Sequence, residues 1–178
     1  KQLGLIDKIP RIAAIQAEGA NPFYKLWHSI DKKLEPMKPD TIASAIKIGN
    51  PVSWEKAFKS IMETDGTVEQ VSDSEILDAK AVIDSSGIGC EPASAASVAG
   101  TRKLKDMGVI SSDEQVVCIL TGNLLKDPET TVKYHLDGVS ARYSNKPRVV
   151  EADLDRIEAI LSQVIKPAQG QEVKHIGN

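Results

Sequence analysis

The sequence has 178 residues, which is enough for one domain with a substantial core and too few to make two domains expected. It is 41% hydrophobic and 26% charged, with a net charge of −3 and no block of Lys and Arg, which argues against a nucleic acid or an anionic membrane as the main partner. No apolar stretch approaches the ~20 residues that cross a bilayer, so no membrane segment is predicted.

Hydrophobic periodicity predicts an alternation of strands and helices along the chain. The first residues, KQLGL, are interpreted as part of a helix. Strands are then predicted at 11–16, 67–72 and 115–120, and helices at 21–30, 53–66, 72–86, 91–108, 127–136 and within 149–165. The strands RIAAIQ and VVCIL are apolar without alternation, which is typical of strands that are buried in a parallel sheet.

Several predicted helices carry signals at their first residues. In the helix 53–66, apolar residues recur at helical spacing, and Ser53 can cap its start. Ser72 and Glu75 form the pattern of a capping box at the start of the next helix. Asp127 can cap the helix that follows it. These signals support the predicted order of elements.

The order of elements indicates the fold class. Strands that alternate with helices are typical of an α/β fold in which crossover helices connect the strands of a parallel sheet. Residues 1–150 are predicted to form one α/β domain. Residues 151–178 are predicted to form a carboxy-terminal helix and a polar tail, and we expect the tail to be mobile.

Cys90 and Cys118 are the only cysteines. Two thiols do not make a disulfide framework in a chain of this size, so we expect a reducing compartment, the cytoplasm. Cys118 is interpreted as a core residue. Cys90 is interpreted as a small packed residue, although a position just before a helix could lower the pKa of its thiol. The three histidines stand apart in the sequence, and no metal site is predicted.

In an open parallel sheet, ligands bind beyond the carboxyl ends of the strands. Four glycine-containing segments are candidates for such a site: 18–22, 44–51, 87–97 and 121–128. The glycines let the backbone come close to a ligand or to another segment. On the residues alone we predict a small polar site in an α/β domain and no more.

Each candidate residue also has an explanation that needs no ligand. Thr121 can be a hydroxyl that ends a strand and satisfies a local backbone group. Glu91 can be a favourable partner of the helix dipole, or a charged group near a cofactor. Close packing alone explains the small residues of the helix 91–108. The segment 87–89 is no dinucleotide fingerprint, because the third glycine is absent and no strand precedes it.

Three motifs together carry a resemblance to a known family. They are AIKIGNPVSWEKA at 45–57, CEPASAAS at 90–97 and LTGNLLKDP at 120–128. In order and spacing they resemble the threonine synthases, which are pyridoxal-phosphate enzymes of the tryptophan-synthase-β-like fold, or fold type II. The resemblance covers roughly residues 1–135.

The resemblance implies pyridoxal 5'-phosphate as the cofactor and the conversion of O-phosphohomoserine and water into threonine and phosphate. It implies that the chain is the carboxy-terminal part of the large domain, whose missing amino-terminal half would be a partner, and that the parent is a homodimer. The family's Schiff-base lysine and its phosphate-binding loop do not occur in this sequence. No catalytic residue is therefore assigned, and we expect this chain alone to be inactive.

The resemblance also implies a set of cofactor-binding residues. The hydroxyl of Thr121 would hydrogen-bond the pyridine nitrogen of the cofactor, and Gly122 would let the chain turn beside the ring. A hydroxyl can donate to an unprotonated nitrogen, whereas a carboxylate would hold that nitrogen protonated. The remaining residues expected to line this side of the cofactor are Ala45, Ile48, Gly49, Glu91 and Ser94.

One departure from the family pattern and two alternatives stay open. Many relatives carry His-Gly where this chain has Asn123-Leu124. That difference affects the surroundings of Thr121 and slightly favours relatives such as the threonine dehydratases. The first alternative is therefore a fragment of a pyridoxal-phosphate threonine or serine dehydratase. The second is an α/β binding module without catalysis, which the absent lysine and phosphate loop would fit.

Overall fold

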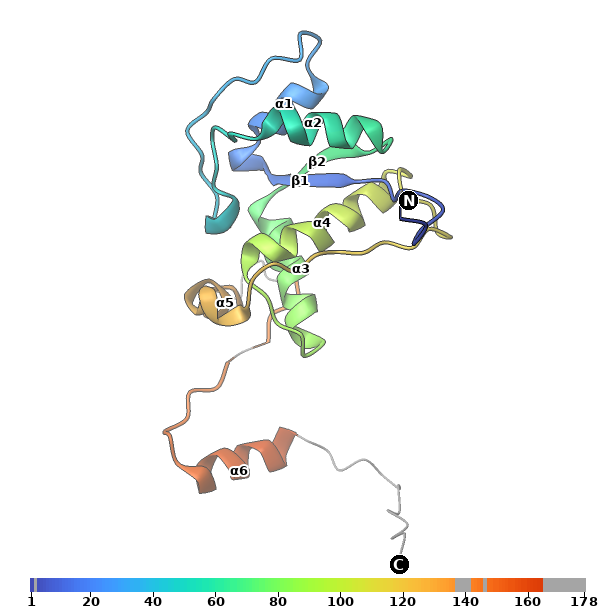
Figure 1. The fold of residues 1–178 in the computed structure, drawn as a ribbon. Helices are drawn as coiled ribbons and strands as arrows, with labels where there is room; N and C mark the ends of the chain where they lie inside the picture. Colours follow the sequence, from blue (N-terminus) through green and yellow to red (C-terminus); the bar gives the residue numbers. More distant parts are fainter. Residues whose placement is uncertain (2, 137–141, 146, 165–178) are drawn as a thin grey trace, which may run out of the picture. The chain divides into compact units, whose positions relative to one another are not determined.

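The computed structural model describes residues 1, 3–136, 142–145 and 147–164, and Figure 1 shows their fold. They belong to two compact units, residues 1–145 and residues 146–178. The elements of the first unit are, in chain order, β1 (Ala13–Ala17), η1 (Glu18–Ala20), α1 (Pro22–His28), η2 (Ser44–Ile46), α2 (Trp54–Glu63), β2 (Thr67–Val71), α3 (Asp73–Ser85), α4 (Pro92–Asp106), η3 (Leu124–Lys126) and α5 (Pro128–Leu136). The second unit contains α6 (Leu154–Val164).

A parallel pair of strands lies at the centre of the first unit. β1 pairs with β2 in a register that runs from Ala13 opposite Thr67 to Ala17 opposite Val71. The chain crosses from one strand to the other through α1, η2 and α2. The predicted α/β class with a parallel sheet and crossover helices is confirmed at this level. The membership of a fold type II large domain stays a prediction.

Helices pack against both faces of this pair, as Figure 1 shows, with α1 and α2 on one side and α4 and α3 on the other. One apolar cluster joins Val68 to Phe23, Leu26 and Ile61, with Trp54 and Phe58 packed against it. The other cluster lies between the strands, α3 and α4, and it contains the following buried residues: Ala17, Ala43, Val71, Ile76, Ala79, Ile83, Cys90, Ala95, Ala96 and Ala99. Burial of these clusters is the main stabilising contribution to the unit.

The small residues of α4 bring this helix close to the strands. A Cβ atom placed on Gly100 would lie 2.4 Å from Cδ1 and from Cγ1 of Ile15 in β1. Since real Cβ atoms do not approach other atoms so closely, only glycine fits there at this helix–strand distance. Close packing therefore accounts for Gly100 in the middle of α4, as expected from composition.

Two of the three predicted helix caps are confirmed. The hydroxyl of Ser72 accepts the N–H of Glu75 at 3.2 Å, and a carboxylate oxygen of Glu75 accepts the N–H of Ser72 at 2.7 Å. Asp127 Oδ1 accepts the N–H of Thr130 at 3.2 Å at the start of α5. The third cap is wrong, because Ser53 precedes α2 without a side-chain capping bond.

Two predicted elements are also wrong. The first residues form a turn closed by a hydrogen bond from Gly4 N–H to Lys1 O, and Gly4 has φ +70°, outside the right-handed helical region. The segment 115–120 is extended but is no strand, because within the described residues its backbone has no strand partner. An extended chain counts as a strand only when a neighbouring strand completes its hydrogen bonds.

The second unit contains one amphipathic helix. α6 lies within the predicted range 149–165, and Leu154, Ile157 and Leu161 on its apolar face are exposed. The expected mobile tail after Pro167 lies outside the described residues. The predicted boundary between the two parts at 150 stays a prediction. Within the described part of the chain, no helix combines the length and the apolar character that spanning a membrane requires.

Candidate functional site

The candidate site lies where the loop 121–127 meets the first turn of α4. Both backbone groups of Gly122 are held by this turn. Its N–H donates to Ser94 Oγ at 2.8 Å, and its carbonyl accepts the N–H of Glu91 at 3.1 Å. Ser94 is 1% exposed, so these bonds are shielded from water. The loop therefore has a fixed position relative to α4.

The hydroxyl of Thr121 lies beside Ser94 and remains available to a ligand. The two hydroxyl oxygens are 3.2 Å apart, and Thr121 is exposed. Because Ser94 Oγ already accepts the N–H of Gly122, it can donate its own hydrogen to Thr121 Oγ1. The hydrogen of Thr121 is then free to be donated outward. This donor fits a ligand atom that accepts a hydrogen bond, such as an unprotonated ring nitrogen.

Glu91 is a buried carboxylate in contact with the same loop. Its side chain is 6% exposed, and a Cβ atom placed on Gly122 would lie 2.0 Å from Glu91 Oε1. Glu91 is the N-cap residue of α4, but its side chain makes no capping bond. Instead, its Oε2 forms an ion pair with Lys126 Nζ at 3.2 Å. Glycine at position 122 therefore leaves room for the carboxylate, which a side chain there would displace.

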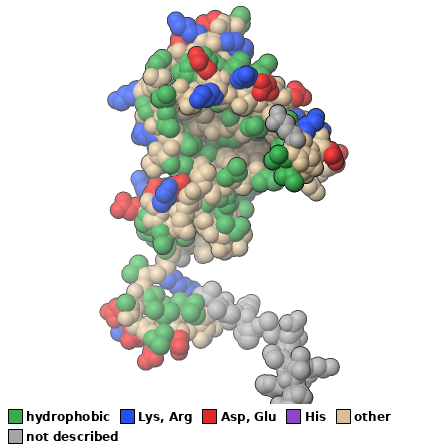
Figure 2. All heavy atoms as spheres, in the orientation of Figure 1, with side chains coloured by type: hydrophobic (Ala, Val, Ile, Leu, Met, Phe, Trp, Pro, Cys, Tyr) green, Lys and Arg blue, Asp and Glu red, His purple; other side chains and the backbone are tan. Residues whose placement is uncertain are grey.

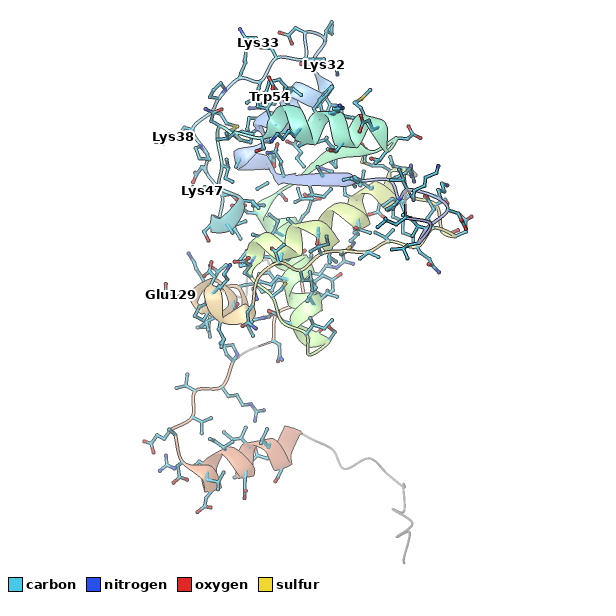
Figure 3. The ribbon with its side chains drawn as sticks, viewed as in Figure 1. Lys32, Lys33, Lys38, Lys47, Trp54 and Glu129 are labelled. Atoms are coloured by element: carbon cyan, nitrogen blue, oxygen red, sulfur yellow. The ribbon has the colours of Figure 1, made fainter. Side chains whose placement is uncertain are left out.

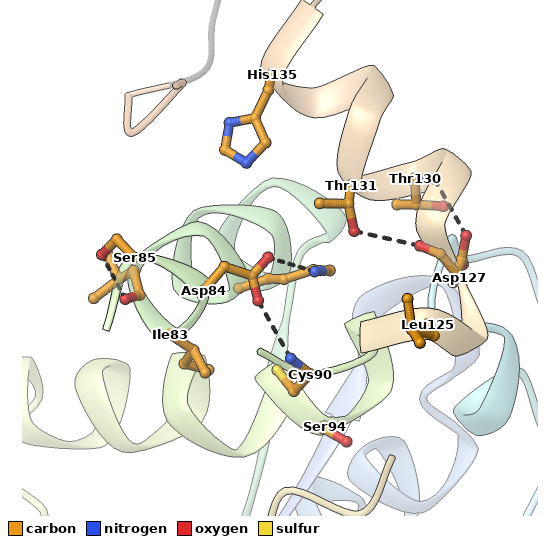
Figure 4. A network of polar contacts seen from close by, with 12 residues as sticks. Ile83, Asp84, Ser85, Cys90, Ser94, Leu125, Asp127, Thr130, Thr131 and His135 are labelled. Carbon is orange, nitrogen blue, oxygen red and sulfur yellow. Dashed lines mark hydrogen bonds and ion pairs between the residues drawn. The ribbon is translucent and has the colours of Figure 1, made fainter. Parts of the chain in front are cut away.

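A second polar network supports the residue that precedes Glu91 (Figure 4). The N–H of Cys90 donates to Asp84 Oδ1 at 3.2 Å, and Asp84 Oδ2 pairs with Lys80 Nζ at 2.6 Å. Lys80 is buried, so its charge is balanced by Asp84 rather than by water. These contacts hold the end of α3 against the start of α4.

The thiol of Cys90 is fully buried in the apolar cluster. Burial raises the pKa of this thiol to about 11, an effect that the positive charge of Lys80 opposes only in part. Cys90 is therefore a neutral packed residue, as expected. The start of α4 does not lower the pKa of its thiol.

The segment 44–49 lies beside α4 but shares none of these polar contacts. η2 packs against α4, and Ala45 and Ile48 are exposed. Gly49 faces away, toward the connection before it, because a Cβ atom there would lie 1.8 Å from the carbonyl oxygen of Met37. Among the described residues, no hydrogen bond joins Ala45, Ile48 or Gly49 to Thr121. Their place in a cofactor site stays a prediction.

Four lysines in the first part of the chain project from its surface. Figure 3 shows Lys32, Lys33 and Lys38 along the connection that leads from α1 to η2, and Lys47 directly after η2. All four are exposed, and Lys47 pairs with Asp40 at 3.1 Å. They have the surroundings of ordinary surface lysines, with water to solvate their charge.

Sequence reasoning missed the role of Lys126. It treated the stretch Lys126-Asp127-Pro128 only as the start of a helix, which holds for Asp127. Glu91 and Lys126 are 35 positions apart, so no local pattern pairs them. A usable signal was the presence of one acidic residue in CEPASAAS and one basic residue in LTGNLLKDP, two motifs that were already expected to meet.

A comparison with known protein families finds a match over residues 2–122 to the family of pyridoxal-phosphate dependent enzymes. The chain belongs to this family. The match ends at Gly122, so it includes Glu91, Ser94 and Thr121, whereas Lys126 lies beyond it. The prediction of pyridoxal phosphate as the cofactor of the family is confirmed.

The chain is also similar to several curated proteins that are named threonine synthase. It is 49% identical over 166 residues to the threonine synthase of Methanosarcina acetivorans, a match with 92% of this chain and 39% of that protein. It is 41% identical over 163 residues to that of Methanocaldococcus jannaschii, with 90% and 38% covered. It is 44% identical over 135 residues to the threonine synthase of Synechocystis sp., a match with 75% of this chain and 33% of that protein. The chain thus spans about two fifths or less of the length of these relatives.

Proposed function

We propose that this chain is part of a threonine synthase, which converts O-phosphohomoserine and water into threonine and phosphate with pyridoxal phosphate as cofactor. The support is the similarity to proteins of that name over most of this chain. The observation that carries the proposal is the exposed hydroxyl of Thr121, which Ser94 and the clamped backbone of Gly122 hold in one place.

In this proposal Thr121 donates a hydrogen bond to the ring nitrogen of the cofactor, and Ser94 orients the hydroxyl. A bound cofactor supplies an electron sink for the substrate's carbon atoms, and a neutral ring favours elimination and replacement over transamination. Gly122 lets the chain turn beside the ring, and a side chain at this position would collide with Glu91. Ala45, Ile48 and Gly49 line the same side of the cofactor. The lysine and the phosphate contacts come from the remaining length of the parent protein.

The relatives' names favour this activity over the dehydratase alternative, because proteins named threonine synthase match the chain at 41–49% identity over most of its length. Membership of the pyridoxal-phosphate dependent enzyme family disfavours a binding module without catalysis. We further propose a homodimeric parent of fold type II in the cytoplasm. The free thiols of Cys90 and Cys118 support a reducing compartment.

The test is an assay of the full-length parent protein, loaded with pyridoxal phosphate. With O-phosphohomoserine we expect threonine and phosphate in equal amounts. With threonine or serine we expect little oxo acid. Thr121→Val keeps the shape of the side chain but removes the donor, and we expect the cofactor to stay bound while threonine formation falls by at least about tenfold. A faster release of oxo acid than of phosphate would contradict the proposal and favour the dehydratase.

A further inference from the structure

Glu91 places a negative charge next to the proposed cofactor site. Its carboxylate contacts Gly122, the residue directly after Thr121, and it is almost inaccessible to water. The N-terminus of α4 favours a negative charge at this position through its dipole. A buried carboxylate nevertheless needs a partner, because an unpaired buried charge is strongly unfavourable.

Lys126 supplies that partner from the other side of the loop. Its Nζ lies 3.2 Å from Oε2 and 3.4 Å from Oε1 of Glu91, so the ammonium group bridges both carboxylate oxygens. The backbone N–H of Lys126 donates to the carbonyl of Asn123 at 3.2 Å, which fixes the base of its side chain in η3. The ammonium group itself stays in contact with solvent, since the side chain is 59% exposed.

The other charged groups at this end of α4 are balanced among themselves. Asp84 pairs with the buried Lys80, and the thiol of Cys90 is neutral because its pKa is raised. Asp127, in the same loop, uses its carboxylate to cap α5. The charged groups at the clamped turn of Gly122 are therefore Glu91 and its partner Lys126. If both are charged, the pair is neutral as a whole. If either is lost, one full charge remains beside Gly122, the residue directly after Thr121.

We propose that Lys126 is a positioning residue that cancels the charge of Glu91, so that the ring nitrogen met by Thr121 stays unprotonated. The inference rests on the proposed function. A carboxylate without its cation would stabilise a protonated ring nitrogen and raise its pKa, whereas a lysine without its carboxylate would lower that pKa. Thr121 can donate only to the unprotonated form. The ion pair and the hydroxyl therefore both favour an unprotonated ring nitrogen.

The test measures the ring nitrogen directly. The full-length parent is loaded with pyridoxal phosphate that carries nitrogen-15 in the ring, and the nitrogen resonance is followed against pH. Relative to wild type, we expect Lys126→Met to move the titration midpoint up by about one pH unit, a roughly tenfold change in the protonated fraction, and Glu91→Gln to move it down. The double variant, which removes both charges, should return to the wild-type midpoint.

Two further variants are controls. Lys126→Arg keeps the charge and should titrate like wild type. Lys133→Met removes an exposed lysine on α5, outside the site, and should also titrate like wild type. If Lys126→Met does not fold, the downward shift of Glu91→Gln and its reversal in the double variant still decide the question, because a purely structural role would not reverse the sign.

The outcomes separate this inference from the proposed function. If the loaded wild type, Lys126→Met, Glu91→Gln and the double variant all have the same titration midpoint, the inference alone is overturned. A full-length parent that binds the cofactor but makes no threonine overturns the proposed activity, whereas the expected shifts would still support the role of Lys126. A parent that takes up no cofactor overturns both.

Discussion

The upstream segment (residues 115–120) and the downstream segment (residues 121–127) are adjacent in the sequence but are held by different forces. In the upstream segment Cys118 and Leu120 face α4 and the core, while Val117 and Ile119 are 87% and 71% exposed. Its backbone has no strand partner among the described residues. In the downstream segment, hydrogen bonds and an ion pair fix each turn of the chain.

This difference shows that Thr121 takes its position from the residues after it in the chain. A buried strand would align the hydroxyl through the strand's hydrogen bonds, but the extended chain before Thr121 contacts α4 on one side only. Gly122, clamped at both its N–H and its carbonyl, does the aligning instead. Changes in the downstream segment should therefore cost more than changes at the exposed positions of the upstream segment.

The largest effect is expected for Gly122→Ala. The added methyl group would overlap the carboxylate of Glu91 and displace this buried group from its position beside Lys126. We expect a loss of about 3 kcal/mol in the free energy of unfolding, measured by urea denaturation. Gly87→Ala is the control, because Gly87 has φ +82° but open space around it, and backbone strain alone should cost about 1 kcal/mol. Equal losses in both variants would mean that the collision with Glu91 is absent in solution.

Ser94→Ala should have the second largest effect. It removes the acceptor of the Gly122 N–H and the neighbour of the Thr121 hydroxyl. We expect a loss of about 1.5 kcal/mol in the free energy of unfolding, because a shielded donor is left without a partner. Ser97→Ala removes a hydroxyl one turn later that bonds mainly within the helix, and it should cost less than about 0.5 kcal/mol. If Ser97→Ala costs as much as Ser94→Ala, the clamp on Gly122 is not a distinct stabilising element.

Substitutions at the exposed positions of the upstream segment should change stability little. Val117→Thr and Ile119→Thr should each change the free energy of unfolding by less than about 0.5 kcal/mol. They should reduce self-association of the chain, measured by analytical ultracentrifugation, because they remove exposed apolar surface. Figure 2 shows that such apolar side chains also reach the surface elsewhere in the molecule. Leu120→Ala, which affects the core side of the same segment, should cost roughly 2 kcal/mol and serves as the control.

The same two segments show how much of the fold could be predicted from the sequence. The parallel pair β1 and β2, the helices between and after them, and two caps follow from periodicity and from local polar signals. These elements depend on residues that are near each other in sequence. The strand prediction at 115–120 was wrong because strand formation also needs a partner, which no apolar pattern in one segment can provide.

The candidate site could be predicted only in part, for a related reason. Thr121, Gly122, Glu91 and Ser94 were named from motifs, and the structure brings these four together. The pairing of Glu91 with Lys126 depends on how the loop turns after Gly122, and that turn is set by contacts between segments distant in sequence. Charge pairs of this kind have no periodicity. The available signal was one acidic and one basic residue in two motifs that are expected to meet, and it does not by itself fix which groups pair.

The smallest expected effect concerns the reactivity of the two cysteines. Cys118 belongs to the upstream segment, and Cys90 lies next to the turn of α4 that holds the downstream segment. Cys90 precedes the clamped turn and is fully buried, while Cys118 belongs to the upstream segment and is only partly buried. Burial raises the pKa of the Cys90 thiol from 9.0 to about 11, so at pH 8 its thiolate fraction is about a hundredfold smaller than that of an unperturbed thiol. Iodoacetamide reacts with the thiolate, so it should modify Cys118 first, as read by peptide mass spectrometry. In urea above the unfolding midpoint, Cys90 regains an ordinary pKa and both sites should react alike. If iodoacetamide modifies Cys90 in the folded chain as fast as Cys118, the start of α4 opens as freely as the segment beside it. That result would contradict a rigid clamp at Gly122.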